Sequence, residues 1–356
     1  MACVVEKFRL VFLPITTIKK VLKNGIKYVT LQFHKNKINM QEKYSIGIDV
    51  GGTNTDIGLV SANGTIVART NFSTSAYSDI NLYMDEVAKK VKEIMSANNV
   101  AEIEGVGIGA PNGNYYTGCI DNAPNLHFGG NLKVKDMLEA RLGVEVVLSN
   151  DANAAAYGEF VYGGGKGMKD FLMVTVGTGV GSGFVVDGRL VHGHSGAAGE
   201  LGHSILIPGG RQCSCGRKGC LEAYTSARGI CQTCRELRAE MPNYNGVLAN
   251  VADDELTSKI IGEAAAQGDE LAIKTFEQTG FWLGLACANA VTFSSPEAVF
   301  LMGGPLQAGD VFVEPLKKSF KEHLLNIYHN TVDIRMSELK ANDVAILGAA
   351  ALLKNK

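Results

Sequence analysis

The stretch 44-YSIGIDVGGTNTDIGLV-60 decides the fold class, because it joins two apolar segments of strand character through a glycine-rich turn. The first segment ends at Asp49, the pair Gly51–Gly52 follows, and the second segment begins directly after Thr53–Asn54. Glycines let backbone amides turn toward an anion, and hydroxyl and amide side chains add donors. An ordinary glycine hairpin has the same signature, so this turn alone indicates a phosphate site only weakly.

Two similar turns occur further along the chain, in 171-FLMVTVGTGVGSGFVV-186 and 298-AVFLMGGP-305. The first turn lacks the Gly-Lys-Ser/Thr of a P-loop, and it leads into a strand and not into the helix of a dinucleotide fingerprint. Three strand-ending glycine turns predict a nucleotide site assembled across a cleft. The candidate phosphate-binding residues are Asp49, Gly51, Gly52, Thr53, Asn54, Thr175, Gly177, Thr178, Gly179, Gly303 and Gly304.

Two aspartates stand at strand ends beside these turns. Asp49 can hold a water on Mg²⁺ between phosphates, or it can simply cap its turn. Asp151 lies in 145-EVVLSNDANAAAYGEF-160, where a β-branched segment gives way to an alanine-rich helix. Because ligands bind at the carboxyl ends of parallel strands, Asp151 is predicted to face the phosphate site and to accept a proton from an attacking hydroxyl. Its alternative role is to cap the helix.

A cluster of cysteines lies in 203-HSILIPGGRQCSCGRKGCLE-222. A disulfide cluster, a nucleic-acid-binding finger and a metal site are the three alternatives. A DNA-reading finger needs a second ligand pair and a basic helix, which this stretch lacks, and a catalytic zinc keeps one position open. A closed structural Zn²⁺ site is therefore predicted, with the ligands His203, Cys213, Cys215 and Cys220. Such a site would fix Glu200 and Glu222, which are either two surface acids or a pair of carboxylates that binds vicinal hydroxyls of a sugar.

The composition is that of a globular protein, with 46% hydrophobic and 20% charged residues among 356. Residues 1–39 carry eight Lys/Arg and one acid, whereas the whole chain has a formal net charge of −2, which leaves −9 on residues 40–356. A body this acidic predicts no nucleic-acid partner. The chain shows no convincing signal peptide and no apolar run long enough for a bilayer, so we expect no membrane association and a cytoplasmic location.

Together the motifs DVGGTN, SNDANAAAYGE, TVGTGVGSGFV, GELGH and CSCGRKGCLEAYTS resemble the ROK family of sugar kinases and sugar-responsive repressors. The resemblance runs from about residue 44 to the end of the chain, and the segment 107-GIGAPNGNYYTGCIDNAPNL-126 is similar to the glucokinases of the family. It implies a two-domain α/β actin/hexokinase-like (ribonuclease H-like) sugar kinase fold with an interdomain cleft. ATP, Mg²⁺ and a structural Zn²⁺ are the implied cofactors.

The resemblance also implies a role for individual residues. Asp151 matches the catalytic base, and the three cysteines with His203 match the zinc ligands. A homodimer or homotetramer is the implied assembly. The implied sugar-binding positions are Asn125, Asn150, Asp151, Glu200, His203 and Glu222. In the segment NAPNLHFGG the pair His127–Phe128 departs from the family pattern, which weakens the expected sugar contact there.

The expected organisation has four parts. Residues 1–39 form a basic extension that is disordered or lies upstream of the native start, residues 40–150 form a small α/β domain, and residues 151–341 form a large one with the zinc-binding loop 203–220. A helix over 342–355 is expected to pack back on the small domain. The preferred activity is phosphorylation of D-glucose at its 6-hydroxyl; the alternatives are N-acetylmannosamine, N-acetylglucosamine, fructose or mannose as the substrate, and a sugar-responsive transcriptional regulator.

Overall fold

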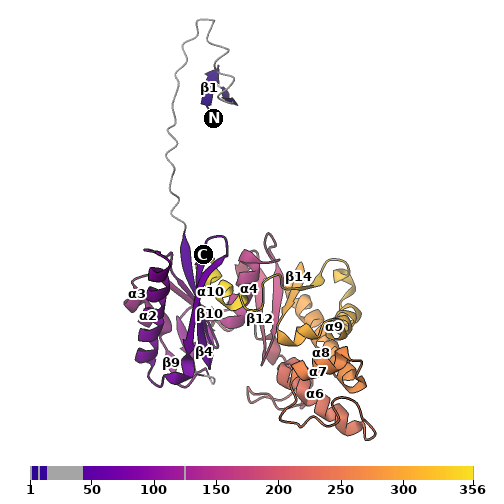
Figure 1. Ribbon diagram of the computed structural model, residues 1–356. Coiled ribbons are helices and arrows are strands. Elements are labelled where there is room, and N and C mark those ends of the chain that lie inside the picture. Colours follow the sequence, from indigo (N-terminus) through magenta and orange to yellow (C-terminus); the bar gives the residue numbers. More distant parts are fainter. Residues whose placement is uncertain (1, 7–8, 14–42, 124–125, 356) are drawn as a thin grey trace. The chain divides into compact units, whose positions relative to one another are not determined.

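The computed structural model describes residues 2–6, 9–13, 43–123 and 126–355, and the chain divides into two units, residues 1–43 and 44–356 (Figure 1). The first unit contains the strands β1 (Ala2–Glu6) and β2 (Arg9–Leu13), which pair antiparallel. The residues of this basic segment show no strand period, so the sequence pattern does not indicate this pairing. The rest of the predicted extension, residues 14–39, lies outside the described residues.

The second unit contains two five-stranded mixed sheets. The first consists, in spatial order, of β10 (Val146–Asn150), β6 (Val106–Ala110), β3 (Tyr44–Val50), β4 (Asn54–Ser61) and β5 (Ile66–Ser73). The second consists of β15 (Asp333–Met336), β14 (Ala298–Met302), β11 (Phe171–Val176), β12 (Val180–Val186) and β13 (Arg189–Leu190). In each sheet the first three strands along the chain form an antiparallel meander, and the last two add in parallel beside the first strand.

The two sheets therefore have the same topology, and the glycine turns take equivalent places in them. The turn at 51–53 joins the first two strands of one sheet, and the turn at 177–179 joins the first two strands of the other. The recurrence of strand, glycine turn and strand in the sequence thus reflects a repeated architecture. Short side chains at a tight turn leave the backbone amides open to a ligand.

Helices cover the faces of the sheets and bury one apolar core against each. The helices α2 (Ile80–Ala97) and α3 (Val134–Leu142) contribute to the core of the first sheet. The core of the second sheet is built with α6 (Ala227–Glu240), α7 (Ser258–Ala266), α8 (Glu270–Ser294) and α9 (Asp310–His323). Among the described residues, no helix has the length and apolar character needed to cross a membrane.

A third, small sheet comes from the segment between β6 and β10. It contains β7 (Gly113–Asn114), β8 (Cys119–Asp121) and β9 (Asn131–Leu132), all antiparallel. The helix α5 (Glu222–Thr225) follows the cysteine-rich segment directly and leads into α6.

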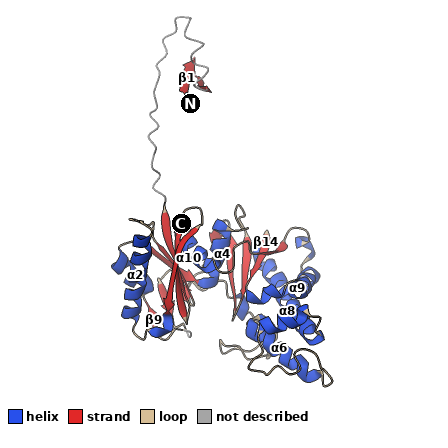
Figure 2. Cartoon of the chain, viewed as in Figure 1, coloured by secondary structure: helices blue, strands red, loops and turns tan. Residues whose placement is uncertain are grey.

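Two helices, α4 (Asp151–Tyr162) and α10 (Val344–Ala351), lie between the two large sheets (Figure 2). A Cβ at Gly107 would lie 1.8 Å from the Ala349 carbonyl oxygen, and one at Gly47 would lie 2.0 Å from the Ile346 carbonyl oxygen. These glycines let the backbone of α10 rest on β3 and β6.

The alanine-rich sequence of α4 serves the same close packing. A Cβ at Gly348 of α10 would lie 2.5 Å from the Ala154 carbonyl oxygen, so the two helices also meet backbone to backbone. On its other side, Ala152 packs against Gly181 of β12, where a further Cβ would lie 2.6 Å away. α4 is thus wedged between α10 and the second sheet, and its first residue, Asp151, is held between the two halves.

A methyl group at position 107 should disrupt this arrangement. Gly107→Ala is expected to lower the free energy of unfolding by about 1–3 kcal/mol, because the α10 backbone must move away from β6. Urea denaturation followed by circular dichroism measures the change. The control is Gly262→Ala in α7, where the new Cβ would meet the nearest atom at 3.4 Å, an ordinary contact. Equal stability of the two variants would contradict the close packing of α10.

Candidate functional site

The first glycine turn, residues 51–53, is accessible to a ligand. The amide of Gly51 donates to the Asn54 carbonyl (3.0 Å), and the Thr53 carbonyl accepts from the Thr74 amide (2.8 Å) and the Ser73 hydroxyl (3.3 Å), so the turn is held at its base. The side chains of Thr53 and Asn54 are exposed. The turn is therefore rigid at its base while its donors remain accessible, as a phosphate-binding loop requires.

The second and third turns lie beside each other. The amide of Gly177 donates to the Gly179 carbonyl (2.9 Å), and the Thr178 side chain is exposed. Gly303 follows β14 with φ = 133°, and a Cβ there would lie 1.8 Å from the Val176 carbonyl oxygen. Only glycine fits, because both the backbone angle and the contact exclude a side chain. The ends of β11 and β14 thus bring these two turns together.

Asp151 is the first residue of α4, but it is not the residue that caps this helix. The cap is Asn150, whose Oδ1 accepts from the amides of Ala152 (2.9 Å) and Asn153 (3.4 Å). The side chain of Asp151 is exposed, and its Oδ1 accepts from the Ala152 amide (2.7 Å). Protein around the carboxyl displaces water and raises its pKa, and the hydrogen bond from Ala152 opposes that rise.

Asp49, at the end of β3, lies close enough to Asp151 to interact with its charge. The pKa of Asp49 is raised to about 6 by burial first, and then by the negative charges of Asp151 and Asp56. Asp56 pairs with Asp49 across the β3–β4 hairpin. A polar cavity of about 660 Å³ adjoins this pair. It is lined by Asp49, Asp56, Arg69, Thr70, Asn71, Ala341, Asn342, Ala345 and Ile346.

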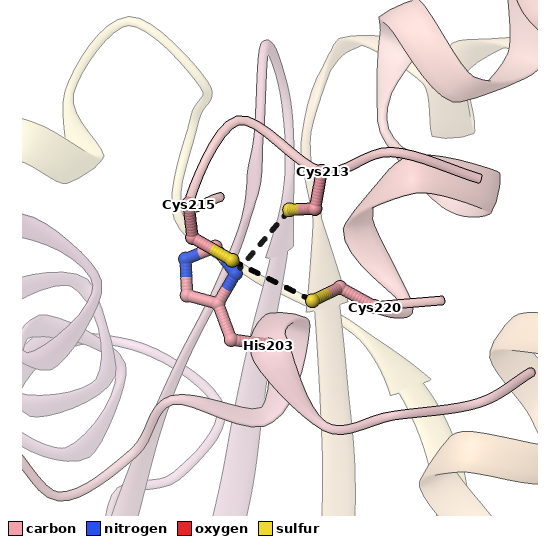
Figure 3. A group of neighbouring side chains, drawn as sticks. All are labelled: His203, Cys213, Cys215 and Cys220. Carbon is pink, nitrogen blue, oxygen red and sulfur yellow. Dashed lines mark hydrogen bonds between the residues drawn. The ribbon is translucent and has the colours of Figure 1, made fainter. Parts of the chain in front are cut away.

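The four predicted metal ligands converge in the structure (Figure 3). The ligand atoms of His203, Cys213, Cys215 and Cys220 all lie within 4.8 Å of one another. Cys215 Sγ lies 3.6 Å from Cys220 Sγ, and Cys213 Sγ lies 3.7 Å from His203 Nδ1. In a tetrahedral zinc site with Zn–S bonds of about 2.3 Å, neighbouring sulfurs stand about 3.7 Å apart. The donor set and its spacing fit a zinc ion.

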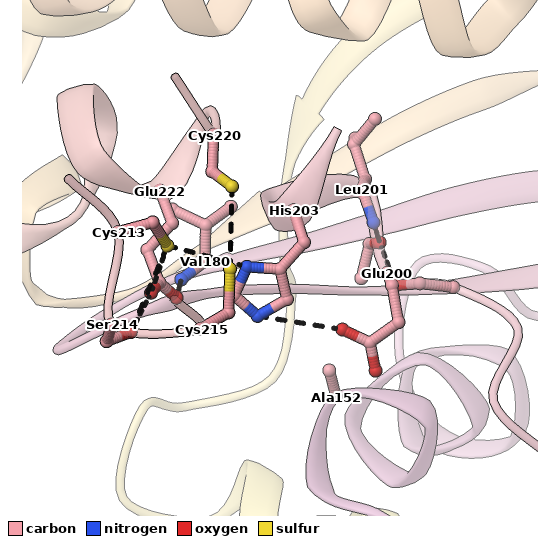
Figure 4. Close-up of polar contacts among 12 residues, drawn as sticks. Ala152, Val180, Glu200, Leu201, His203, Cys213, Ser214, Cys215, Cys220 and Glu222 are labelled. Atoms are coloured by element: carbon pink, nitrogen blue, oxygen red, sulfur yellow. Dashed lines mark hydrogen bonds and ion pairs between the residues drawn. The ribbon is translucent and has the colours of Figure 1, made fainter. Parts of the chain in front are cut away.

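His203 presents its two ring nitrogens to different partners. Nδ1 faces Cys213 in the cluster, whereas Nε2 lies 4.0 Å from Glu200 Oε2 (Figure 4). The Glu200 carboxyl has its pKa raised by burial; His203 opposes the rise, and the negative charges of Asp151 and Glu222 add to it. Glu200 therefore shares one electrostatic environment with Asp151.

Glu222 joins the cysteine-rich segment to the second glycine turn. Its Oε2 accepts from the Val180 amide (3.0 Å), and its Oε1 accepts from the Ser214 hydroxyl (2.9 Å) (Figure 4). A Cβ at Gly179 would lie 2.5 Å from Oε2, so a side chain there would displace the Glu222 carboxylate from this position. Of the predicted sugar-binding positions, only Asn125 lies outside the described residues.

Two arginines support the cluster and were missed by the sequence analysis, since no ligand spacing marks them. Arg217 donates to the His203 carbonyl and so joins the two ends of the metal-binding segment. Arg211 stacks over the Tyr224 ring, 4.5 Å from its centroid, and donates to the Thr233 hydroxyl (3.0 Å). These contacts attach the segment to α5 and α6 through protein groups alone.

Comparison with known proteins identifies relatives over nearly the whole second unit. The model of the ROK family matches residues 45–356. A glucokinase of Halalkalibacterium halodurans is 33% identical over 321 residues, which span 89% of this chain and 97% of that protein.

Solved structures agree with this assignment. The crystal structure of a ROK family glucokinase from Streptomyces griseus in complex with glucose and AMPPNP is 30% identical, with a TM-score of 0.73, and covers 88% of this chain and all of that one. A ROK family transcriptional regulator, a homologue of the E. coli MLC protein, is 25% identical, has a TM-score of 0.77 and covers 95% of this chain and 83% of its own. These matches confirm the resemblance and the fold class predicted from the sequence: the chain belongs to the ROK family and has its actin/hexokinase-like fold.

Proposed function

We propose that this protein is an ATP-dependent hexose kinase that phosphorylates the 6-hydroxyl of D-glucose. The observation that carries the proposal is the position of Asp151. Its charge acts on Asp49, beside the first glycine turn, and on Glu200, beside His203. One carboxylate thus lies between a group of backbone donors suited to phosphates and a pair of side chains suited to sugar hydroxyls. The glucokinase similar to this chain binds glucose and AMPPNP together.

In the proposed reaction the oxygen of the sugar 6-hydroxyl attacks the γ-phosphorus of ATP. The bond from that phosphorus to the β–γ bridging oxygen breaks, ADP leaves, and Asp151 takes the hydroxyl proton. Phosphoryl transfer has a loose transition state, so the proton can leave late and the base need not be strong. Amides of the glycine turns stabilise the charge on the phosphate oxygens, while Glu200, His203 and Glu222 orient the sugar.

Two metal ions belong to the proposal. Asp49 would hold Mg²⁺, which would neutralise phosphate charge when it is bound with ATP. Zn²⁺ would be bound by the cluster of His203 and three cysteines, where it acts structurally because all four positions are taken by protein. With Nδ1 of His203 committed to the metal, Nε2 stays available to Glu200 and the sugar.

The identity of the sugar is tested with a coupled ADP-release assay under Mg-ATP. The panel contains glucose, mannose, fructose, N-acetylmannosamine and N-acetylglucosamine. A large preference for glucose in kcat/KM is expected. Preference for another member keeps the kinase mechanism and changes the substrate. Absence of ADP release with all five sugars, together with retardation of DNA at physiological salt, would instead favour a regulator like the transcriptional relative.

Asp151→Asn tests the base. The variant keeps the shape of the side chain but cannot take a proton, so kcat should fall about 10²- to 10⁴-fold while the dissociation constant for the sugar stays nearly unchanged. Steady-state kinetics and calorimetry measure the two quantities. Asp136→Asn is the matched control, since Asp136 is an acid in the first turn of α3. If Asp151→Asn and Asp136→Asn turned over equally fast, another group would be the base.

Cys215→Ser tests the zinc site. Loss of one thiolate should reduce zinc affinity at least about 100-fold, lower the melting temperature and raise the KM for the sugar. Metal analysis of the purified proteins, thermal melting and kinetics provide the measurements. Cys119→Ser removes a buried thiol on β8, outside the cluster, and should retain full zinc. A zinc-free Cys215→Ser protein with unaltered sugar KM would disconnect the metal from the sugar site.

A further inference from the structure

Two loops from different halves of the second unit contact each other next to the candidate sugar site. One is the 114–118 turn, which joins β7 to β8. The other is the 191–199 loop, which follows β13 and ends directly before Glu200 and the 3₁₀-helix η2 (Leu201–His203). The proposed mechanism uses neither of these two loops.

Asn114 makes four hydrogen bonds with its carboxamide. Oδ1 accepts from the amides of Tyr116 (3.1 Å) and Thr117 (3.4 Å), which shapes the 114–118 turn. Nδ2 donates to the carboxylate of Asp121 (3.2 Å) within the same hairpin and to the Ser195 carbonyl (3.0 Å) in the 191–199 loop. A carboxamide offers two donor hydrogens and two acceptor lone pairs, so all of its capacity is used.

The fit around this contact is tight. Gly196 has φ = 85°, and a Cβ there would lie 2.5 Å from Asn114 Oδ1. An additional atom at Gly196 would therefore require the Asn114 side chain to move, and the left-handed backbone there favours glycine.

Tyr115 makes the second contact between the two loops. Its ring stacks on His192 with centroids 3.9 Å apart and an interplanar angle of 8°. His192 is 7% exposed, and its Nε2 lies 3.1 Å from the side-chain nitrogen of Asn355. The His192 imidazole, near the beginning of the 191–199 loop, is thus buried against the Tyr115 ring.

The far end of the 191–199 loop is fixed as well. The Ser182 hydroxyl donates to the Gly199 carbonyl and accepts from the Leu201 amide (3.2 Å). Because the loop is held at both ends, the contacts of Asn114 and Tyr115 help to set the path of the backbone that leads into the residues that follow it. Those residues are Glu200 and His203, whose side chains face each other at 4.0 Å.

We propose that Asn114 and Tyr115 are positioning residues of the sugar site. By holding the 191–199 loop, they place Glu200 and His203 for the sugar, and so couple sugar affinity to contact between the two halves of the protein. The inference rests on the proposed sugar kinase activity. It adds that the affinity for the sugar depends on side chains outside the sugar's own contact shell.

The test compares three variants of the full chain. Tyr115→Ala should raise the sugar KM about fivefold, with the KM for ATP and the melting temperature little changed, because the lost stack orients only the sugar side. Tyr115→Phe keeps the ring and should restore the wild-type KM. Tyr116→Ala is the matched control: Tyr116 is the next residue, is 59% exposed and meets His192 only edge-on at 6.0 Å.

Two further variants keep the inference falsifiable if Tyr115→Ala folds poorly. Asn114→Asp keeps the turn-forming oxygen but loses the donors to Ser195 and Asp121 and places a second carboxylate beside Asp121, so it should raise the sugar KM as well. His192→Ala should add nothing to Tyr115→Ala in a double-mutant cycle. A sugar KM in Tyr115→Ala and Asn114→Asp equal to that of Tyr116→Ala would overturn the inference while leaving the kinase proposal intact. A wild-type protein inactive on every sugar would contradict both the inference and the kinase proposal.

Discussion

The close approach of the backbones of the first sheet, α10 and α4 is the constraint on which the rest of the structure depends. α10 can lie on the first sheet only because Gly47 and Gly107 carry no side chain, and it can lie on α4 only because Gly348 meets Ala154 directly. Because no side chains intervene at these contacts, the thickness of α10 and α4 sets the distance between the two sheets. Asp151, at the beginning of α4, is held between the two halves by this arrangement.

The repeated sheet topology places a glycine turn at the same point of each sheet. In both sheets the turn follows the first strand along the chain. The halves differ in what lies next to the turn. Asp49 and Asp56 stand on the first sheet, whereas Glu222 reaches the second turn from the metal-binding segment. The same sheet topology thus has different charged side chains beside its glycine turn in the two halves.

Local signals in the sequence were sufficient to predict much of the fold and of the candidate site. Strand, glycine turn and strand predicted the hairpins, and the spacing of Cys213, Cys215 and Cys220 with His203 predicted a cluster that the structure brings together. Contacts between distant segments could not be predicted. The bond from Val180 to Glu222 and the bond from Asn114 to Ser195 depend on loop conformations that no periodicity encodes. The cap of α4 was also ambiguous, because Asn150 and Asp151 are both good capping residues.

Three carboxylates of the candidate site lie close enough for their charges to interact. Asp49, Asp151 and Glu200 each have a raised pKa, and each of Asp49 and Glu200 is raised in part by Asp151. An acid whose pKa is higher in the folded chain binds protons preferentially there, so for Asp49 stability falls as the pH rises from 3.8 through about 6. Above that range the ionised groups repel one another. A cation beside Asp49, or hydroxyl donors to Asp151 and Glu200, would offset this repulsion, so ligand binding and stability are linked at the same three side chains.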